Sequence, residues 1–165
     1  MEQNNKLGYV LGLLRLTIGF IFLWAFVDKV FGLGFATTAE KSWLSGGSPT
    51  TGFLQFGVHG PWATFFQSLA GMPIIDWLFM LGLLFIGLSL MLGILTRLGS
   101  LFGIIMLALM YGAVGIWPAN NPFIDEHIVY ILVIIILALT NSGQYLGLGK
   151  WWENTLFVQK YKLFK

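Results

Sequence analysis

The sequence predicts an all-α membrane protein, a bundle of four transmembrane helices with an amphipathic helix on the outer face, in the first loop. Four apolar runs carry this prediction, and they span residues 7–31, 74–95, 98–117 and 124–140. A helix that crosses the hydrocarbon core of a bilayer needs about 20 mostly apolar residues. The composition agrees, because 57% of the residues are hydrophobic and 10% are charged, with a mean hydropathy of +0.81. We therefore expect a single integral membrane domain over residues 1–165.

The first run, 7–31, is too long for a signal peptide, lacks a small-residue cleavage site and leads directly to Asp28 and Lys29. We expect it to remain in the mature protein. Arg15 lies about eight residues, or roughly 12 Å, into this run. Two interpretations stay open: the side chain reaches back to the cytoplasmic interface, or it faces inward and binds a carbonyl, a headgroup or an anion.

Trp24 lies one helical turn before Asp28 and on the same face of the predicted helix. An aromatic plane beside a carboxylate suits a flat, quinone-like ring with oxygens that accept protons. An aromatic belt residue beside an ordinary interfacial charge explains the same pair.

The predicted outer loop, 32–73, contains the amphipathic segment 61–70. Its apolar side chains follow the i, i+3, i+4, i+7 spacing of one helix face, at Trp62, Phe65, Phe66 and Leu69. Pro61 suits the first helical position, and Gly71 suits the stop. Such a helix acts either as a lid over the bundle or as an interfacial anchor, and the sequence does not separate the two roles.

The second and third runs are joined at Thr96 and Arg97, a link so short that the two helices must pack as antiparallel neighbours. Small residues repeat at the GxxxG spacing at Gly8 and Gly12, and again at Gly99 and Gly103. This spacing indicates tight packing within the chain, with a homo-oligomeric interface as the alternative.

The fourth run begins with a polar cluster. Asp125 suits an N-terminal cap, and Glu126 and His127 follow it, with Tyr130 one turn further on. Acid, imidazole and phenol groups at the mouth of a membrane helix are suited to passing protons.

The basic residues predict the orientation. With four spans both termini lie on one side, which receives seven of the nine lysines and arginines. The positive-inside rule then places both termini, and the tail 141–165, in the cytoplasm of a multi-pass plasma-membrane protein. The absence of cysteine excludes disulfides, iron–sulfur clusters and thiol redox chemistry. We expect no metal site, because His59 and His127 do not follow a metal-binding spacing, and no nucleic-acid partner.

Three parts of the chain carry a family pattern: RLTIGFIFLWA at 15–25 with Asp28-Lys29, WLSGGSP at 43–49 with GFL at 52–54, and DEHIVY at 125–130 with GLGKWWE at 147–153. In this order they resemble the DoxX/DoxD family of small four-helix membrane proteins. The resemblance implies a membrane subunit linked to quinones, since the DoxD branch is described as the large subunit of a thiosulfate:quinone oxidoreductase that works with a second subunit. Phe26 departs from the small residue expected there.

Two functions follow from the residues and the resemblance together. In the first, the chain passes electrons from thiosulfate or another small outer-face reductant to a quinone. The groups that handle protons are then His127, Glu126 and Asp28, and those that hold the quinone or its anionic oxygens are Arg15, Trp24, Lys29, Asp125 and Tyr130. In the second, the chain is a non-catalytic anchor or stabilising subunit of a redox complex. The partners expected are the lipid bilayer and a second redox subunit or another copy of the chain.

Overall fold

The computed structural model describes residues 2–115, 118 and 122–161, and all regular secondary structure in these residues is helical. Three helices are long and apolar enough to cross a membrane: α1 (Glu2–Phe31), α3 (Pro73–Leu92) and α4 (Thr96–Val114). The chain is therefore all-helical and has the long apolar helices of a multi-pass membrane protein, as predicted.

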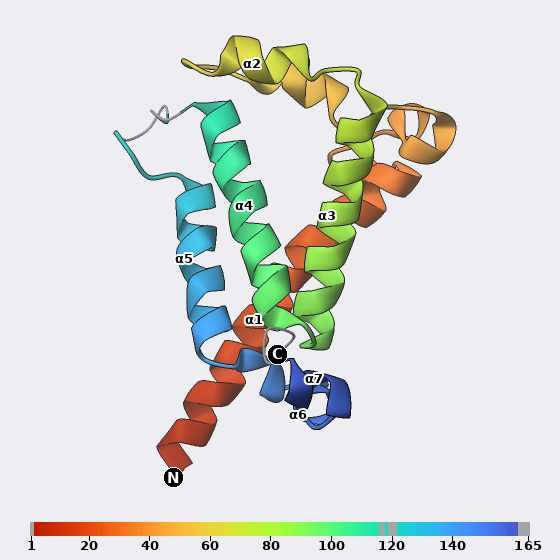
Figure 1. Cartoon of the computed structure of the whole chain (residues 1–165). Coiled ribbons are helices and arrows are strands. Elements are labelled where there is room, and N and C mark those ends of the chain that lie inside the picture. The colour runs from red at the N-terminus through yellow and green to blue at the C-terminus, as the bar shows by residue number, and fades with distance from the viewer. Residues whose placement is uncertain (1, 116–117, 119–121, 162–165) are drawn as a thin grey trace.

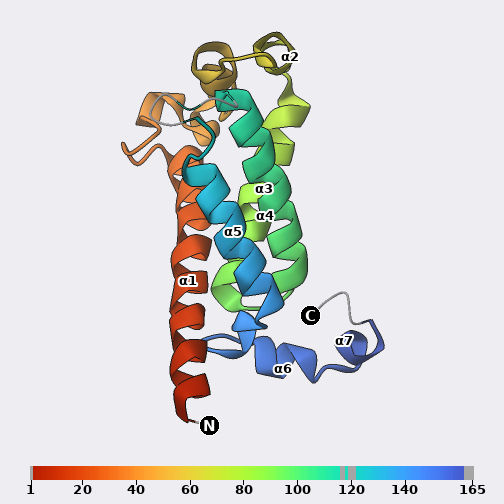
Figure 2. The same cartoon turned by 90° about the vertical axis from the view of Figure 1, so that its left-hand side faces the viewer.

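The fourth predicted span, 124–140, contains the shorter helix α5 (Glu126–Leu139). Its 14 residues are mainly apolar after Glu126 and His127. They rise about 21 Å, which by itself falls short of the ~30 Å hydrocarbon core. It lies beside the longer helices in both views (Figures 1 and 2).

The long helices pack in the order α3, α4, α5, with α1 running along α3 and also contacting α5. The two ends of the described chain lie at the same end of the bundle, which we call the terminal end (Figures 1 and 2). The opposite end carries the long connection between α1 and α3, and we call it the loop end. The main core runs between the helices and consists of Ile18, Phe22, Met80, Leu83, Ile86, Leu90, Leu107, Ile134 and Leu137.

Both predicted pairs of small residues pack within the chain. A side chain at Gly12 would begin 2.8 Å from the carbonyl oxygen of Tyr145, and one at Gly103 would begin 3.2 Å from the side chain of Ile134. These approaches bring α1 against the segment that follows α5, and α4 against α5. The intramolecular interpretation of the GxxxG spacing is confirmed at these contacts.

The turn between α3 and α4 comes earlier than predicted. Helix α3 ends at Leu92, because Gly93 adopts a left-handed conformation with φ 74°, and Leu95 is also left-handed with φ 53°. Thr96 and Arg97, predicted as the link, are the first residues of α4. The hydroxyl of Ser89 lies 2.7 and 2.9 Å from the carbonyl oxygens of Ile94 and Leu95, so it satisfies acceptors that the turn leaves free. Residues 116 and 117, at the predicted end of this span, lie outside the described residues.

The connection at the loop end contains short helical turns, η1 (Ala39–Lys41), η2 (Trp43–Ser45) and η3 (Phe53–Gly57), and the short helix α2 (Ala63–Ser68). Helix α2 lies across the loop end, above α3 and α4 (Figure 1). A second small core forms beneath it from Leu54, Val58 and Ala113, with Phe66 and Leu69 packed against it.

The predicted helix over 61–70 is thus six residues long, and Pro61 lies in a turn before it. The apolar side chains of this segment point in two directions. Phe66 packs inward, whereas Trp62 and Phe65 are more than half exposed. The side chains that face away from the protein suit an interfacial anchor.

Candidate functional site

A hydrogen-bonded Asp–His pair lies at the start of α5, at the loop end. One oxygen of Asp125, Oδ1, accepts the backbone N–H groups of His127 and Ile128 at 3.0 and 3.3 Å, which caps the helix. The other oxygen, Oδ2, lies 2.7 Å from Nδ1 of His127. A single carboxylate therefore begins the helix and orients the imidazole, and the histidine is buried, with 8% of its surface exposed.

This pairing leaves Nε2 as the ring nitrogen that can exchange a proton, since no described residue forms a hydrogen bond with it. A carboxylate behind an imidazole holds the ring in one tautomer and one orientation, as in general acid–base sites. The sequence predicts that Asp125 caps the helix, but it groups His127 with Tyr130, one turn further on. The extended backbone of Asp125, with φ −122° and ψ −174°, turns its carboxylate back over the first turn instead.

The other two residues of the predicted cluster lie differently. Glu126 is exposed, whereas Tyr130 is half-buried and packs against the main core. One oxygen of Asp125, one oxygen of Glu126 and one ring nitrogen of His127 lie within 4.8 Å of one another, so these three residues could together offer three ligand atoms to a metal ion. Both oxygens of Asp125 already accept hydrogen bonds.

Asp28 fastens the start of the long connection to the end of α1. Its carboxylate is almost fully buried, with 1% of the residue exposed, and accepts the backbone N–H groups of Phe35 at 3.2 Å and Ala36 at 2.9 Å. The ring of Phe35 then lies edge-on to Trp24, with ring centroids 5.1 Å apart. Phe20 stacks on the same indole at 5.7 Å. Two rings of the chain itself thus contact Trp24, and Lys29 beside it is half-buried.

Asp76, in the first turn of α3, makes a second anchor that was not predicted from the sequence. Its Oδ1 accepts hydrogen bonds from the Thr50 hydroxyl at 2.6 Å, the Ser48 hydroxyl at 2.8 Å and the Thr50 backbone N–H at 3.2 Å. The hydroxyl-rich turn Ser48-Pro49-Thr50-Thr51 needs a nearby acceptor, and this is the signal that could have indicated the pairing.

Arg15 lies at the terminal end, fully buried. Its guanidinium donates only to backbone carbonyls. Two of these belong to the last turn of α3, at Leu90 and Met91 (3.1 Å for Met91). The others follow α5, at Ser142 (3.4 Å), Tyr145 (3.0 Å) and Leu146 (3.0 Å).

These carbonyls match the five N–H donors of a guanidinium, and the C-terminal end of α3 favours a positive charge. The side chain therefore faces inward, as the second interpretation predicted, and joins α1, α3 and the segment after α5. None of its donors is left over for a ligand.

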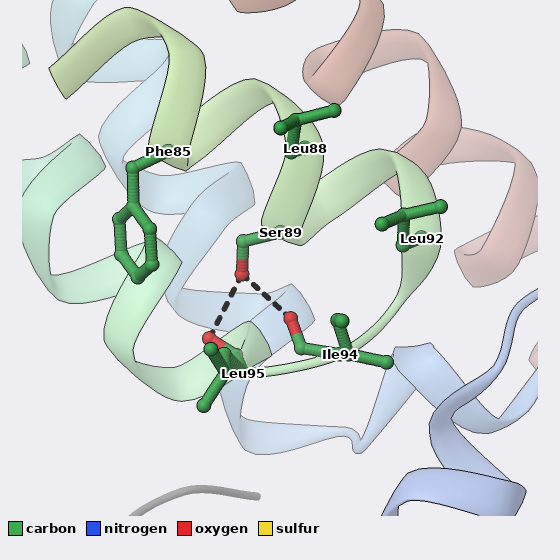
Figure 3. A pocket seen from close by; sticks show the side chains of 6 residues that line it. All are labelled: Phe85, Leu88, Ser89, Leu92, Ile94 and Leu95. Carbon is green, nitrogen blue, oxygen red and sulfur yellow. Dashed lines mark hydrogen bonds between the residues drawn. The ribbon is translucent and has the colours of Figure 1, made fainter. Parts of the chain in front are cut away.

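A pocket of about 180 Å³ also lies at the terminal end, lined by Phe85, Leu88, Ser89, Leu92, Ile94 and Leu95 (Figure 3). The polar group in its lining is the Ser89 hydroxyl, which is hydrogen-bonded to the carbonyl oxygens of Ile94 and Leu95 in the turn (Figure 3). The pocket lies beside the turn between α3 and α4, at the opposite end of the bundle from the start of α5 (Figure 1).

The predicted site residues therefore fall into three groups. Asp125, Glu126 and His127 come together at the start of α5. Trp24, Asp28 and Lys29 hold the end of α1 and the start of the connection, and no hydrogen bond or ion pair among the described residues joins Asp28 to His127. Arg15 lies at the far end of the bundle.

The role of Asp28 as an anchor can be tested with Asp28→Asn. Each carboxylate oxygen accepts one N–H, and an amide nitrogen cannot accept, so one hydrogen bond should be lost at a cost of about 1–3 kcal/mol. The exposed Lys41 should then be cleaved several-fold faster by trypsin in detergent. Gln55→Ala, which changes an exposed side chain of the same connection away from Lys41, should leave the cleavage rate unchanged. Equal rates for Asp28→Asn and the parent would contradict the anchor.

The long apolar helices and the polar groups that close their ends define the class as a multi-pass membrane protein. Comparison of the chain with protein-family models, with curated proteins and with solved structures gives no match. The resemblance to the DoxX/DoxD family therefore rests on the residues quoted above.

Proposed function

We propose that the protein is a quinone-linked redox protein of the plasma membrane, with the Asp125–His127 pair as its proton-handling group. The observation that carries the proposal is the 2.7 Å contact between Asp125 Oδ2 and His127 Nδ1 at the mouth of an apolar helix. Buried, carboxylate-oriented imidazoles are uncommon where only packing is needed, because an apolar residue would serve there at less cost. The family resemblance supplies the substrate class: thiosulfate or another small reductant, and a quinone.

In this proposal the reductant supplies two electrons, and His127 delivers protons from Nε2 to the quinone oxygens one at a time. Asp125 holds the proton on Nδ1, so that Nε2 is the atom that releases and takes up the transferred proton. Glu126, which is exposed beside it, returns protons from water. Asp125 is a positioning residue, since its own oxygens are occupied by the helix cap and the ring.

The residues fit a quinone at His127 better than at the other predicted positions. Trp24 already contacts Phe20 and Phe35, Asp28 holds two backbone N–H groups, and Arg15 is fully engaged. We therefore expect Trp24, Asp28 and Arg15 to shape and stabilise the protein around the site. Lys29 and Tyr130, both half-buried, are the remaining candidates to contact the quinone.

The proposal includes four membrane crossings. Both ends of the described chain lie at the terminal end (Figures 1 and 2), which requires an even number of crossings. Helix α5 would cross together with the residues that flank it, and the bilayer can thin around a short helix at modest cost. The basic side chains favour a cytoplasmic terminal end; of these, Lys162 and Lys165 lie outside the described residues.

The orientation can be tested by cysteine labelling, because the chain has no cysteine of its own. Leu44→Cys lies at the loop end on a side chain that is 71% exposed. In intact cells it should react with an impermeant thiol reagent. Gln159→Cys, which is exposed at the terminal end, should react only after the membrane is permeabilised. The reverse pattern would overturn the orientation.

A second candidate function is a non-catalytic subunit that anchors or stabilises a redox complex. The observation in its favour is that three charged side chains, Arg15, Asp28 and Asp76, have well-defined structural partners. In either case we propose that the chain works with a second redox subunit or with another copy of itself.

The two functions are separated by purifying the protein in mild detergent and analysing the extracted lipids by mass spectrometry. The redox proposal expects about one quinone per chain, and quinone reduction when thiosulfate or another small reductant is added with the partner subunit. A protein that carries no quinone and reduces none, with or without its partner, would leave the anchoring function.

A further inference from the structure

The segment that follows α5 lies across the terminal end of the bundle, roughly perpendicular to the long helices (Figure 2). It contains η4 (Ser142–Gln144), α6 (Gly149–Glu153) and α7 (Leu156–Lys160). One side of the segment is fastened to the bundle. The backbone N–H of Leu148 donates to the carbonyl of Leu92 at 2.8 Å, Gln144 donates to Glu153 at 2.9 Å, and Val158 is fully buried.

The hydrogen bond to Leu92 fixes the depth of this segment. Leu92 is the last residue of α3, one of the helices long enough to cross a membrane, so α6 begins where the apolar span ends. The long helices define the bilayer normal. A segment perpendicular to them at this level lies in the plane of the headgroups.

The exposed surface of the segment is largely apolar. Trp151 is 64% exposed and Leu156 is 85% exposed, and Leu146 and Leu148 are about half exposed. Tryptophan and leucine on a short helix in the interfacial plane are typical of side chains that insert among the acyl chains near the headgroups.

Exposed basic side chains lie in the same segment and at the same end of the bundle. Lys150 in α6 and Lys160 in α7 are exposed, as are Lys6 in α1 and Arg97 in α4 at the same end. Glu153 is the acid of the segment, and it receives the Gln144 side chain. A basic, aromatic surface at headgroup depth matches the negative charge of anionic phospholipids.

We propose that residues 146–161 form a surface that binds anionic phospholipids of the leaflet in which it lies. Trp151 and Leu156 insert below the headgroups, while Lys150 and Lys160 contact their phosphates. A protein partner suits this surface less well, because its apolar side chains are spread over separate short helices and flanked by lysines. Lipid binding by this surface does not depend on the redox function proposed above.

The test uses one labelled cysteine in the full chain. Leu156→Cys carries an environment-sensitive fluorophore and is reconstituted into phosphatidylcholine vesicles that contain one fifth phosphatidylglycerol. Brominated acyl chains, which quench the fluorophore on contact, are placed in one set of vesicles on the phosphatidylglycerol and in the other on an equal amount of phosphatidylcholine. We expect strong quenching by the anionic lipid and weak quenching by the zwitterionic one, with the difference reduced in high salt.

A charge variant and a label at the other end complete the experiment. Removing both lysines with Lys150→Ser and Lys160→Ser should lower the preference for phosphatidylglycerol by roughly 30-fold, the product of two headgroup contacts of the usual strength. Leu44→Cys, labelled at the loop end, should show no change on the same double substitution. Gel filtration in detergent checks that the variants fold.

Two results would overturn the proposal. If aqueous iodide quenches the label at position 156 equally in all vesicles, the segment lies in water, and a protein must cover its apolar side. If the label is shielded but both brominated lipids quench it equally, and the lysine substitutions change nothing, the segment inserts without recognising anionic lipid.

Discussion

Replacing Arg15 with leucine is expected to lower the stability of the folded protein strongly. The guanidinium is fully buried and donates to carbonyls of three separate segments. Its loss leaves up to four buried acceptors without donors, since the Ser142 carbonyl also accepts the backbone N–H of Tyr145 at 3.2 Å. A buried acceptor left unsatisfied costs about 1–3 kcal/mol, so the loss amounts to several kcal/mol, and a chain of this size should then melt about 10 °C lower or more. Melting followed by gel filtration in detergent measures this.

Arg97→Leu is the matched control. Arg97 is exposed at the same end of the bundle and makes one long hydrogen bond, 3.5 Å, to Asn141. Its replacement should change the free energy of unfolding by no more than about 0.5 kcal/mol. Arg15→Lys should fall between the two, because an ammonium has three donors in a compact group and cannot reach five carbonyls. Equal melting of Arg15→Leu and Arg97→Leu would remove the structural role assigned to Arg15.

His127→Gln is expected to lower quinone-dependent turnover by about 100-fold or more, the usual effect of losing a general acid–base group. Glutamine keeps part of the hydrogen-bonding shape beside Asp125 but cannot carry the proton. Initial rates of quinone reduction, measured with the reductant and the partner subunit present, give the ratio. Bound quinone should remain near one per chain, because the loss is in proton transfer.

His59→Gln is the control, since His59 is the other histidine, lies in the loop-end connection and is exposed. Its turnover should equal that of the parent. Asp125→Asn should reduce turnover as well, because an amide holds the imidazole tautomer poorly. Should His127→Gln alter only the melting temperature, the anchoring function would be favoured.

The long helices could be predicted from the sequence because the length of an apolar run is enough to indicate a helix that crosses a membrane. The ranges 7–31, 74–95 and 98–117 all overlap the observed α1, α3 and α4. Their ends were less accurate, since the position of a turn depends on backbone conformation. Gly93 could take the left-handed conformation that ended α3, but nothing in the sequence indicated that Leu95 would take it too.

The positions of the polar groups were predicted better than their hydrogen-bond partners. The sequence placed Arg15 inside or at the edge of the bundle but could not name its partners, because backbone carbonyls carry no side-chain signal. Asp125 was predicted as a cap, and its second oxygen reached His127 through a backbone angle that sequence spacing does not specify. The proton-relay, quinone and lipid roles remain predictions for the experiments above.

The way Arg15 is held has a consequence for how the protein is made. Three of its acceptors belong to residues synthesised 127 to 131 positions after it. At usual ribosome speeds of about 5–20 residues per second, the nascent first helix waits roughly 6 to 26 s for them. During that time its guanidinium must be hydrated or held by headgroups. A chain that terminates prematurely after α5 but before residue 142 never receives these acceptors, so we expect such truncations to be as damaging as loss of the arginine itself.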